Sequence, residues 1–521
     1  MPTAGAKRWP CVCEVHMQLN LTNIHYSYAG SPHEVLSGVT LSLPAGWTGV
    51  VGDNGCGKST LARIATGMLW PTGGSVGPVG LVSAYCEQDS ACAPAALADF
   101  ASAWDREAVR LRDALGIGDD WAWRFDELSS GQQKRLQVAV TLWSRPDVLV
   151  MDEPTNHLDA PAREAVLLAL GSFTGIGILI SHDRDLLDAL AKRCVSFEGG
   201  KVRMRPGNYS QTFEQRKREI AAETDAQDRA RKEGRRLAAE RQRRVEAASR
   251  ADGLRSRRGL DPRDHDAREK IGRAIVSGKD ARATHLVTAL DERIRGQRAR
   301  AELAYVERRY DGDVPPLGER SRRAVIARLT AGLVRYGGEA GVPGVLIPDL
   351  ILGASDHVGI VGPNGSGKST LVRTVVEAVP KDVPMLFVPQ ELDHAYAERA
   401  ISCLASLSTA DRGRVLSVVA QLNSRPEAML EGNEPSPGEL RKLVVAEAVL
   451  TKPQLLVMDE PTNHLDLHST EALQRMLASF PGAVVLVSHD AWVVRSSCGR
   501  IWRLEPAKGG DFACGSVLIE R

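Results

Sequence analysis

Short apolar runs recur along the chain, and each is followed by glycine or by charged residues. Residues 148–151 (VLVM) and 455–458 (LLVM) are two such runs without any polar alternation. Runs of this kind are typical of strands buried on both faces of a parallel sheet. The stretch 165–180 carries no charge, but its glycines favour a helix, a turn and a buried strand over a membrane span. The pattern therefore predicts an α/β fold and no transmembrane segment.

Three motifs occur twice, in the same order. GDNGCGKST at 52–60 recurs as GPNGSGKST at 362–370, and ISHD at 180–183 recurs as VSHD at 487–490. VLVMDEPTNHLD at 148–159 recurs as LLVMDEPTNHLD at 455–466. The offsets are 310 residues for the first motif and 307 for the other two. Near-constant spacing predicts a duplicated α/β domain of about 200 residues.

The segment between the two copies has a different pattern. From 209 to about 251 it has no proline and is rich in the helix formers Arg, Glu, Ala and Gln. A break around Gly253, Gly259 and Pro262 precedes a second run with apolar residues at helical spacing. These are Ala283, Leu286, Val287, Leu290 and Ile294. We expect an antiparallel helical hairpin, which about 40 residues would extend to roughly 60 Å.

These features divide the chain into four parts. We expect an unstructured N-terminal extension at 1–16, a first α/β domain at 17–208, a helical linker at 209–320 and a second α/β domain at 321–521.

Charge is balanced overall but separated along the chain. The 521 residues include 66 Lys+Arg and 65 Asp+Glu, for a formal net charge of +1. Residues 211–310 hold 27 basic and 18 acidic residues, which leaves 39 basic against 47 acidic outside. A basic hairpin on an acidic body favours contact with RNA phosphates, although a solvated charged helix would have a similar composition. The nine scattered cysteines, without paired CxxC spacing, indicate a reducing compartment.

Both glycine-rich loops match G-x-x-x-x-G-K-[ST] and follow an apolar run. Such loops turn backbone N–H groups toward phosphate oxygens at the start of a helix. We expect Lys58 and Lys368 to reach the β- and γ-phosphates of ATP, and Ser59 and Ser369 to bind Mg²⁺. The remaining predicted nucleotide contacts in the loops are Gly52, Asn54, Gly55, Gly57, Thr60, Gly362, Asn364, Gly365, Gly367 and Thr370.

An acidic pair ends each buried run, where parallel sheets bind their ligands. Asp152 and Asp459 are the predicted Mg²⁺ contacts, and Glu153 and Glu460 are predicted to orient the attacking water. His182 and His489 follow later apolar runs and are expected to contact the γ-phosphate, although either alone could be a structural histidine.

The order of these motifs resembles an ATP-binding-cassette (ABC) ATPase, present twice. In that family a signature loop completes the partner domain's site, and LSSGQ at 128–132 and PSPGE at 435–439 are similar to it. The resemblance implies that Ser129, Gly131, Ser436 and Gly438 contact ATP across the domain pair. It also implies roles for Gln88 and Gln390 beside Mg²⁺ and water, and for Tyr28 and Tyr336 against adenine. The second signature departs from the family by lacking the leading leucine.

The whole chain most resembles the ABC-F class of tandem cassettes joined by a charged linker. PTNHLD at 154–159 and 461–466 and GNYS at 207–210 carry that resemblance. It implies a cytoplasmic, monomeric ATPase whose two cassettes pair with each other and whose linker at 209–320 reaches rRNA and P-site tRNA. Only 40 residues separate Gln88 from Leu128, which favours the subgroup that protects ribosomes from antibiotics at the peptidyl-transferase and exit-tunnel region.

Two other functions fit parts of the sequence. A tandem ATPase serving a separately encoded membrane transporter explains both cassettes but not the basic hairpin. An RNA-binding scaffold with inactive cassettes explains the hairpin but not the intact lysines and acidic pairs.

Overall fold

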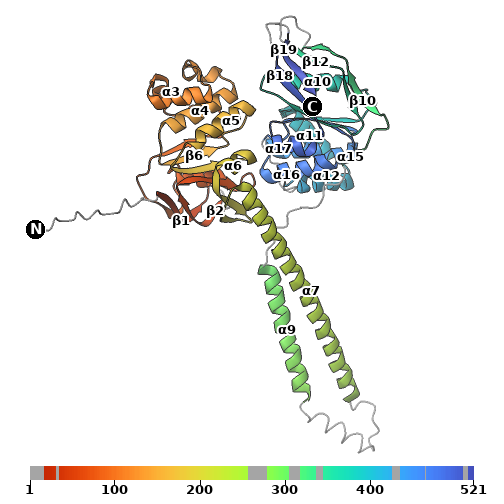
Figure 1. Ribbon diagram of the computed structural model, residues 1–521. Coiled ribbons are helices and arrows are strands. Elements are labelled where there is room, and N and C mark those ends of the chain that lie inside the picture. The colour runs from red at the N-terminus through yellow and green to blue at the C-terminus, as the bar shows by residue number, and fades with distance from the viewer. Residues whose placement is uncertain are drawn as a thin grey trace, which may run out of the picture. The chain divides into compact units, whose positions relative to one another are not determined.

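The structure is a computed structural model that describes residues 17–30, 34–255, 279–303, 317–335, 344–392, 394–424, 435–463, 465–507 and 514–520. The predicted extension at 1–16 lies outside these residues. The chain forms two compact units: one comprises Met1–Thr212 with Arg309–Arg521, and the other comprises Phe213–Arg308. The first unit holds both cassettes, and the second holds most of the linker (Figure 1).

The first cassette is built on a six-stranded sheet in the order β5-β6-β7-β3-β8-β9. All its pairs are parallel except β8 with β9. A second sheet, in the order β2-β1-β4, is antiparallel. The strands are β1 (Gln18–Tyr26), β2 (Leu36–Pro44), β3 (Gly46–Val51), β4 (Gly73–Gly77), β5 (Ser83–Cys86), β6 (Val148–Asp152), β7 (Ile176–Ile180), β8 (Ala191–Glu198) and β9 (Lys201–Pro206).

The second cassette repeats this order. Its eight-stranded sheet reads β11-β12-β19-β18-β14-β17-β16-β15, so β15-β16-β17-β14-β18-β19 matches the six strands of the first cassette one for one. The strands are β10 (Val325–Leu329), β11 (Gly332–Val334), β12 (Gly344–Ile347), β13 (Leu350–Gly353), β14 (His357–Val361), β15 (Met385–Val388), β16 (Leu455–Asp459), β17 (Ala483–Val487), β18 (Arg500–Pro506) and β19 (Cys514–Glu520). The predicted duplication is confirmed at the level of strand order.

The central strands are apolar because both faces of each sheet are covered. Every residue of β6, β7, β16 and β17 is buried. The uncharged stretch 165–180 forms the end of α5, a turn and β7, as its pattern predicts. In β7, a Cβ added to Gly177 would lie 2.4 Å from the Trp47 ring, so the absent side chain lets the indole pack on the strand.

Several helices begin at a residue whose side chain accepts hydrogen bonds from free N–H groups of the first turn. Asp159 and Asp466 accept backbone hydrogen bonds at the starts of α5 and α16. The first cassette contains α1 (Lys58–Ala65), α2 (Leu97–Ser102), α3 (Arg106–Leu115), η1 (Trp121–Trp123), η2 (Phe125–Glu127), α4 (Ser130–Trp143), α5 (Ala160–Gly171) and α6 (Arg184–Leu190). The second contains α10 (Lys368–Ala378), α11 (His394–Ser406), α12 (Thr409–Gln421), α14 (Pro437–Ala446), α15 (Ala448–Thr451), α16 (Leu467–Ser479) and α17 (Ala491–Ser497).

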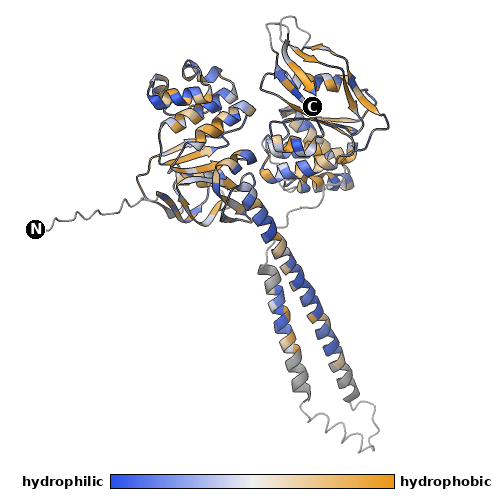
Figure 2. Cartoon of the chain, in the orientation of Figure 1, coloured by the Kyte–Doolittle hydropathy of each residue, from blue (hydrophilic) through white to orange (hydrophobic). Residues whose placement is uncertain are grey.

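The linker contains two long helices, α7 (Tyr209–Arg255) and α9 (Lys279–Leu303). Figure 2 shows α7 as largely hydrophilic. The two helices meet through one small apolar cluster, in which Leu237 of α7 is buried against Leu290 and Ile294 of α9. Arg241 donates to Asp291 across the same pair at 2.6 Å. The predicted helical hairpin is therefore confirmed, and its 47-residue first helix is about 70 Å long.

The second cassette begins a few residues before the predicted boundary at 321. Leu317 is buried in that cassette's core, and Gly318 fits closely against Phe480. Among the described residues, none of the helices combines the length and apolarity needed to cross a membrane.

Candidate functional site

The first glycine-rich loop connects β3 to α1. Lys58 lies at the first residue of α1 and is 8% exposed, and its ammonium donates to the carbonyls of Gly52 and Asp53 at 2.8 and 2.9 Å. Gly57 precedes α1 with a φ of 103°, and a Cβ there would lie 2.9 Å from Val35. Only glycine fits this position, which leaves the loop's N–H groups turned around one point.

The second loop, between β14 and α10, has the same construction. The Lys368 ammonium donates to the carbonyls of Gly362 and Pro363, each at 3.1 Å, and Gly367 has a φ of 89°. On α10, Ser369 donates to Asp459 at 3.0 Å, so these predicted Mg²⁺ contacts lie side by side. In the first cassette Asp152 takes a hydrogen bond from Tyr85 at 2.7 Å, a contact that the sequence did not indicate.

Glu153 and Glu460 follow their strands in a left-handed backbone conformation. Their φ angles are 49° and 48°, which is unfavourable for a residue with a side chain. The backbone N–H of Glu153 donates to the carbonyl of Ile180, and that of Glu460 to the carbonyl of Val487, each at 2.9 Å. Ile180 and Val487 end the neighbouring strands, so these bonds fix the turn. The carboxyl groups are thereby held at the carboxyl edge of the sheet.

Both glutamates are buried without full hydrogen bonding. Within the described part of the chain, the Oε1 atoms of Glu153 and Glu460 have no hydrogen-bond partner. Burial, followed by the adjacent Asp152 carboxylate, raises the pKa of Glu153 to about 8, and burial raises the pKa of Glu460 to about 7. A carboxyl group with a pKa near neutral can accept a proton from water at working pH.

A histidine faces each glutamate. The Nε2 atom of His182 lies 3.4 Å from Oε1 of Glu153, and Nε2 of His489 lies 3.5 Å from Oε1 of Glu460. Burial, helped by the Lys58 ammonium, lowers the pKa of His182 to about 3, and burial with Lys368 lowers that of His489 to about 4. Both imidazoles are therefore neutral at pH 7 and can donate or accept one hydrogen bond.

The two signature segments begin helices through matching capping boxes. Ser129 and Gln132 exchange hydrogen bonds at the start of α4, and Ser436 and Glu439 do so at the start of α14. The second signature, despite its altered sequence, has the same local geometry. Its carboxylate in place of an amide leaves a negative charge at this helix start.

The predicted glutamines Gln88 and Gln390 are exposed, and a buried cation holds the backbone of each. Lys134 on α4 donates to the carbonyl of Gln88 at 3.0 Å, and Arg441 on α14 donates to the carbonyl of Gln390 at 2.6 Å. Sequence reasoning missed both cations. Alignment of the two copies at the 307-residue offset pairs Lys134 with Arg441 and could have found them.

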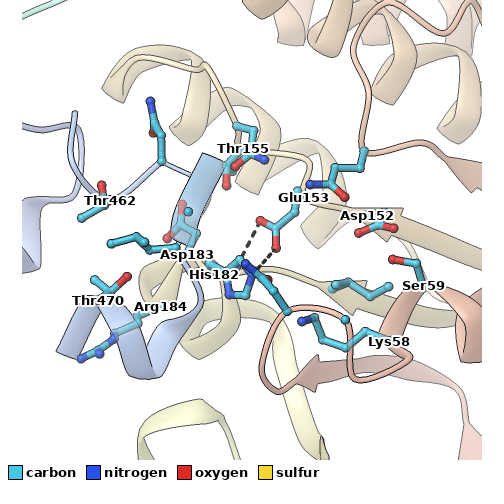
Figure 3. A pocket seen from close by; sticks show the side chains of 18 of the residues that line it. Lys58, Ser59, Asp152, Glu153, Thr155, His182, Asp183, Arg184, Thr462 and Thr470 are labelled. Atoms are coloured by element: carbon cyan, nitrogen blue, oxygen red, sulfur yellow. Dashed lines mark hydrogen bonds and ion pairs between the residues drawn. The ribbon is translucent and has the colours of Figure 1, made fainter. Parts of the chain in front are cut away.

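One pocket of about 500 Å³ brings residues from both cassettes together (Figure 3). Figure 3 shows Lys58 and Ser59 on one side and Thr462, Thr470 and Arg184 on the other, with Glu153 and His182 between them. From the first cassette, the pocket takes the predicted residues Tyr28, Asn54, Gly55, Gly57, Lys58, Ser59, Thr60, Gln88, Asp152, Glu153 and His182. From the second it takes Ser436 and Gly438. The phosphate loop of one cassette thus faces the signature of the other.

Around the second loop, contacts again cross between cassettes. Asn364 donates to the carbonyl of His157 at 3.1 Å and to Asp159 at 3.3 Å. A Cβ on Gly131 would lie 3.0 Å from that same His157 carbonyl, so the first signature is close to the second loop. Arg163 of α5 donates to the carbonyl of His489 at 3.0 Å.

The two predicted adenine contacts differ in what can be described. Tyr28 is 46% exposed, lies in the pocket and shares a hydrogen bond with Thr60 at 2.9 Å. Tyr336 lies outside the described residues. Sequence reasoning missed Arg163, Arg184 and Trp492, all of which line the pocket.

Comparison with known proteins agrees with this geometry. The family described as ABC transporter matches residues 36–156 and 348–463. The "ATP-binding protein Uup" of Caulobacter vibrioides is 30% identical over 483 residues, covering 88% of this chain and 72% of that protein. This chain belongs to the ABC-F family.

Two further relatives belong to the same family. The "Tylosin resistance ATP-binding protein TlrC" of Streptomyces fradiae is 29% identical, with 91% of this chain and 94% of that protein covered. The "Energy-dependent translational throttle protein EttA" of Mycobacterium tuberculosis is 26% identical, with 90% and 88% covered. This ABC-F protein is an ATPase, and its cassettes bind ATP.

Solved structures show the same fold. "RNase-L Inhibitor" superposes with a TM-score of 0.59 at 17% identity, over 95% of this chain and 90% of that one. "Model of ribosome-bound archaeal Pelota and ABCE1" gives 0.60 at 16% identity, over 96% and 78%.

Proposed function

We propose that this ABC-F ATPase binds the ribosome and acts on translation, protecting the ribosome from antibiotics at the peptidyl-transferase and exit-tunnel region. The observation that carries the proposal is the basic α7–α9 hairpin, inserted between two cassettes that share a pocket. The names of two relatives, a translational throttle and a tylosin resistance protein, support it.

The hairpin has the charge and exposure that an RNA ligand requires. Its segment 211–310 exceeds neutrality by nine positive charges, while the rest of the chain is acidic by eight. Long side chains project to solvent from both helices, because among the described residues the buried apolar contact between them is confined to Leu237, Leu290 and Ile294. The exposed basic residues include Arg231, Lys232, Arg235, Arg236 and Arg243 of α7 and Arg293, Arg295 and Arg298 of α9. Counterion release from phosphates would drive such binding.

We infer that the linker at 209–320 contacts rRNA and P-site tRNA in the cytoplasm. The cassettes of one chain pair with each other, which lets a monomer complete both ATP sites. A transporter subunit would need neither the length nor the charge of this hairpin.

The residues present fit Mg²⁺ with ATP. The donor set in each cassette consists of hydroxyl and carboxylate oxygens, which Mg²⁺ prefers, and Ser369 already lies within hydrogen-bonding distance of Asp459. Ser59 with Asp152, and Ser369 with Asp459, would hold the ion, which neutralises charge on the β- and γ-phosphates when bound. Among the described residues, the Oε1 atoms of Glu153 and Glu460 accept no hydrogen bond although they lie beside His182 and His489, so they can take a hydrogen bond from water.

Ribosome co-sedimentation tests the partner. The Glu153→Gln, Glu460→Gln double variant should pellet with ribosomes in the presence of ATP and low salt, because hydrolysis no longer reopens the cassettes. Adding Lys58→Ala and Lys368→Ala is the matched control and should leave the protein in the supernatant. A double variant that stays in the supernatant with ATP contradicts the proposal.

Salt dependence tests the hairpin's part in binding. Neutralising Arg255, Arg257 and Arg258 should weaken ribosome binding and lower the slope of log affinity against log salt by about 2 to 3. An unchanged slope would show that these three arginines do not contact ribosomal phosphates.

Growth inhibition tests the antibiotic part separately. A susceptible host that expresses the chain should show raised minimum inhibitory concentrations for peptidyl-transferase and exit-tunnel antibiotics only. The Lys58→Ala, Lys368→Ala variant should lose this protection. Ribosome binding without protection from any of these antibiotics would exclude the resistance role and would indicate that the protein is a translation factor.

A further inference from the structure

A cluster of four residues joins the two cassettes to the start of the linker helix: Arg184 of α6, Glu471 of α16, Trp492 of α17 and Tyr209 of α7. The Arg184 guanidinium donates to Glu471 at 2.8 Å and stacks 3.9 Å from the centre of the Trp492 ring. The Tyr209 hydroxyl lies 3.5 Å from the same Glu471 oxygen, and its ring centre lies 5.8 Å from Arg184. None of these contacts involves a residue predicted for ATP binding.

The ion pair is shielded from water. The Arg184 and Glu471 side chains are 12% and 17% exposed, and Tyr209 is 5% exposed. A pair at this depth is screened little by salt, and removal of one partner leaves the other charge poorly solvated. The pair is therefore stronger than an exposed surface ion pair.

The position of Arg184 connects the cluster to the ATPase site. Arg184 is the first residue of α6 and comes two residues after His182, whose backbone N–H donates to Glu153 at 3.2 Å. Arg184 and Trp492 line the same pocket as Lys58. Movement of the second cassette would therefore pull on Arg184 and shift the segment that places His182 beside Glu153.

The other end of α6 holds the linker. The backbone N–H of Ser210, in the first turn of α7, donates to Asp188 at 2.7 Å, and its hydroxyl donates to the same carboxylate. Since α6 has only seven residues, both ends belong to one short helix of about two turns. Tyr209 is thus fixed both by α6 and by the second cassette.

This arrangement is made on one side of the cassette pair. The 307-residue offset places Ala491 at the position equivalent to Arg184, and an alanine cannot form an ion pair. The residue equivalent to Glu471 is Glu164, which is exposed. The residues that form the bridge at the first ATP site therefore do not recur at the equivalent positions of the duplicated sequence.

We propose that Arg184 is a positioning residue for ATP hydrolysis, which through Glu471 and Trp492 aligns the His182 segment with the second cassette and seats the first turn of α7 on that contact. The occupant of the contact is the second cassette itself, so the proposal does not depend on ribosome binding. Through this contact, the docking of the second cassette on the first ATP site also holds the first turn of α7, where the hairpin begins.

Charge exchange in the full-length protein tests the proposal. With the second ATP site inactivated by Glu460→Gln, Arg184→Glu and Glu471→Arg should each lower kcat for ATP hydrolysis about tenfold, with KM changing less than about threefold, because Lys58 and the loop still bind ATP. The double variant should recover kcat to within about threefold of the Glu460→Gln parent. Arg475→Glu, an exposed charge reversal on the same helix as Glu471, is the matched control and should leave kcat unchanged.

Two outcomes would overturn the proposal: single reversals with the kcat of the Glu460→Gln parent, or a double variant no better than either single one. If a reversal fails to fold, Arg184→Gln removes the charge but keeps a polar side chain and should lower kcat about fivefold, whereas Arg184→Lys keeps the charge and should retain more of the activity. Equal kcat for the glutamine and lysine variants would contradict a role for the charge.

A double-variant cycle tests the connection to α7. Tyr209→Leu should lower kcat about threefold in the same Glu460→Gln parent but have no further effect once Arg184→Gln is present. Independent, multiplying effects would show that Tyr209 does not act through Arg184.

Discussion

Replacement of Glu153 by glutamine should stabilise the first cassette, by an amount that increases with pH. Glu153 is 4% exposed, and burial followed by the Asp152 charge raises its pKa from 4.5 to about 8. Between these two values the folded protein keeps a proton that the unfolded chain has released. The free energy of unfolding therefore falls as the pH rises from about 4.5 to about 8 and is then constant.

The size of the effect follows from the width of that window. Each pKa unit corresponds to about 1.4 kcal/mol, so the carboxylate costs about 2 kcal/mol at pH 6 and about 5 kcal/mol at pH 8.5. Glutamine has nearly the same shape and carries no charge. The variant should gain these amounts relative to wild type, which is a large fraction of a cassette's stability.

Hydrogen exchange gives the site-resolved assay. The amides of β6 and β7 report opening of the first cassette, and their exchange against urea, in EDTA and without nucleotide, gives its free energy of unfolding. Glu164→Gln, an exposed position on α5, is the matched control and should change stability by less than about 0.5 kcal/mol. Glu460→Gln should give a smaller gain in β16 and β17, about 3 kcal/mol, because its pKa is raised to about 7.

A constant difference between wild type and Glu153→Gln from pH 6 to pH 8.5 would refute the reasoning. So would an equal gain in the Glu164→Gln control. The expected result means that the site holds a destabilising carboxylate at the position proposed to orient the attacking water, a common trade between stability and activity.

Three further results are expected. Leu237→Ala should destabilise the α7–α9 pairing by about 2 to 3 kcal/mol, seen as faster amide exchange in α9, whereas Val245→Ala at a 37% exposed position should have little effect. Lys134→Met should lower kcat about tenfold, because the carbonyls of the Gln88 loop lose a buried donor, and an unchanged kcat would separate that loop from catalysis. Lys58→Ala combined with Lys368→Ala should abolish ATP hydrolysis in a phosphate-release assay, so activity that persists would contradict both loop assignments.

Much of the fold was predictable because its signals are local. Uninterrupted apolar runs such as β6 identify buried parallel strands, and the loop glycines fix backbone turns within a few residues. The hairpin followed from the absence of proline and the helical spacing of Leu290 and Ile294. Sequence pattern alone could not give their partner, because Leu237 lies more than 50 residues away and meets them only when the helices pair.

The site shows the same division. The sequence by itself identified the candidate residues for the chemistry, since Lys58, Asp152 and Glu153 lie in motifs whose spacing encodes their local geometry. The family resemblance implied that Ser436 of the second cassette faces the first phosphate loop, but only the tertiary structure decided that Arg184 meets Glu471. Burial also set the pKa of Glu153, because desolvation depends on every segment packed around the carboxyl group and not on its neighbours in the chain.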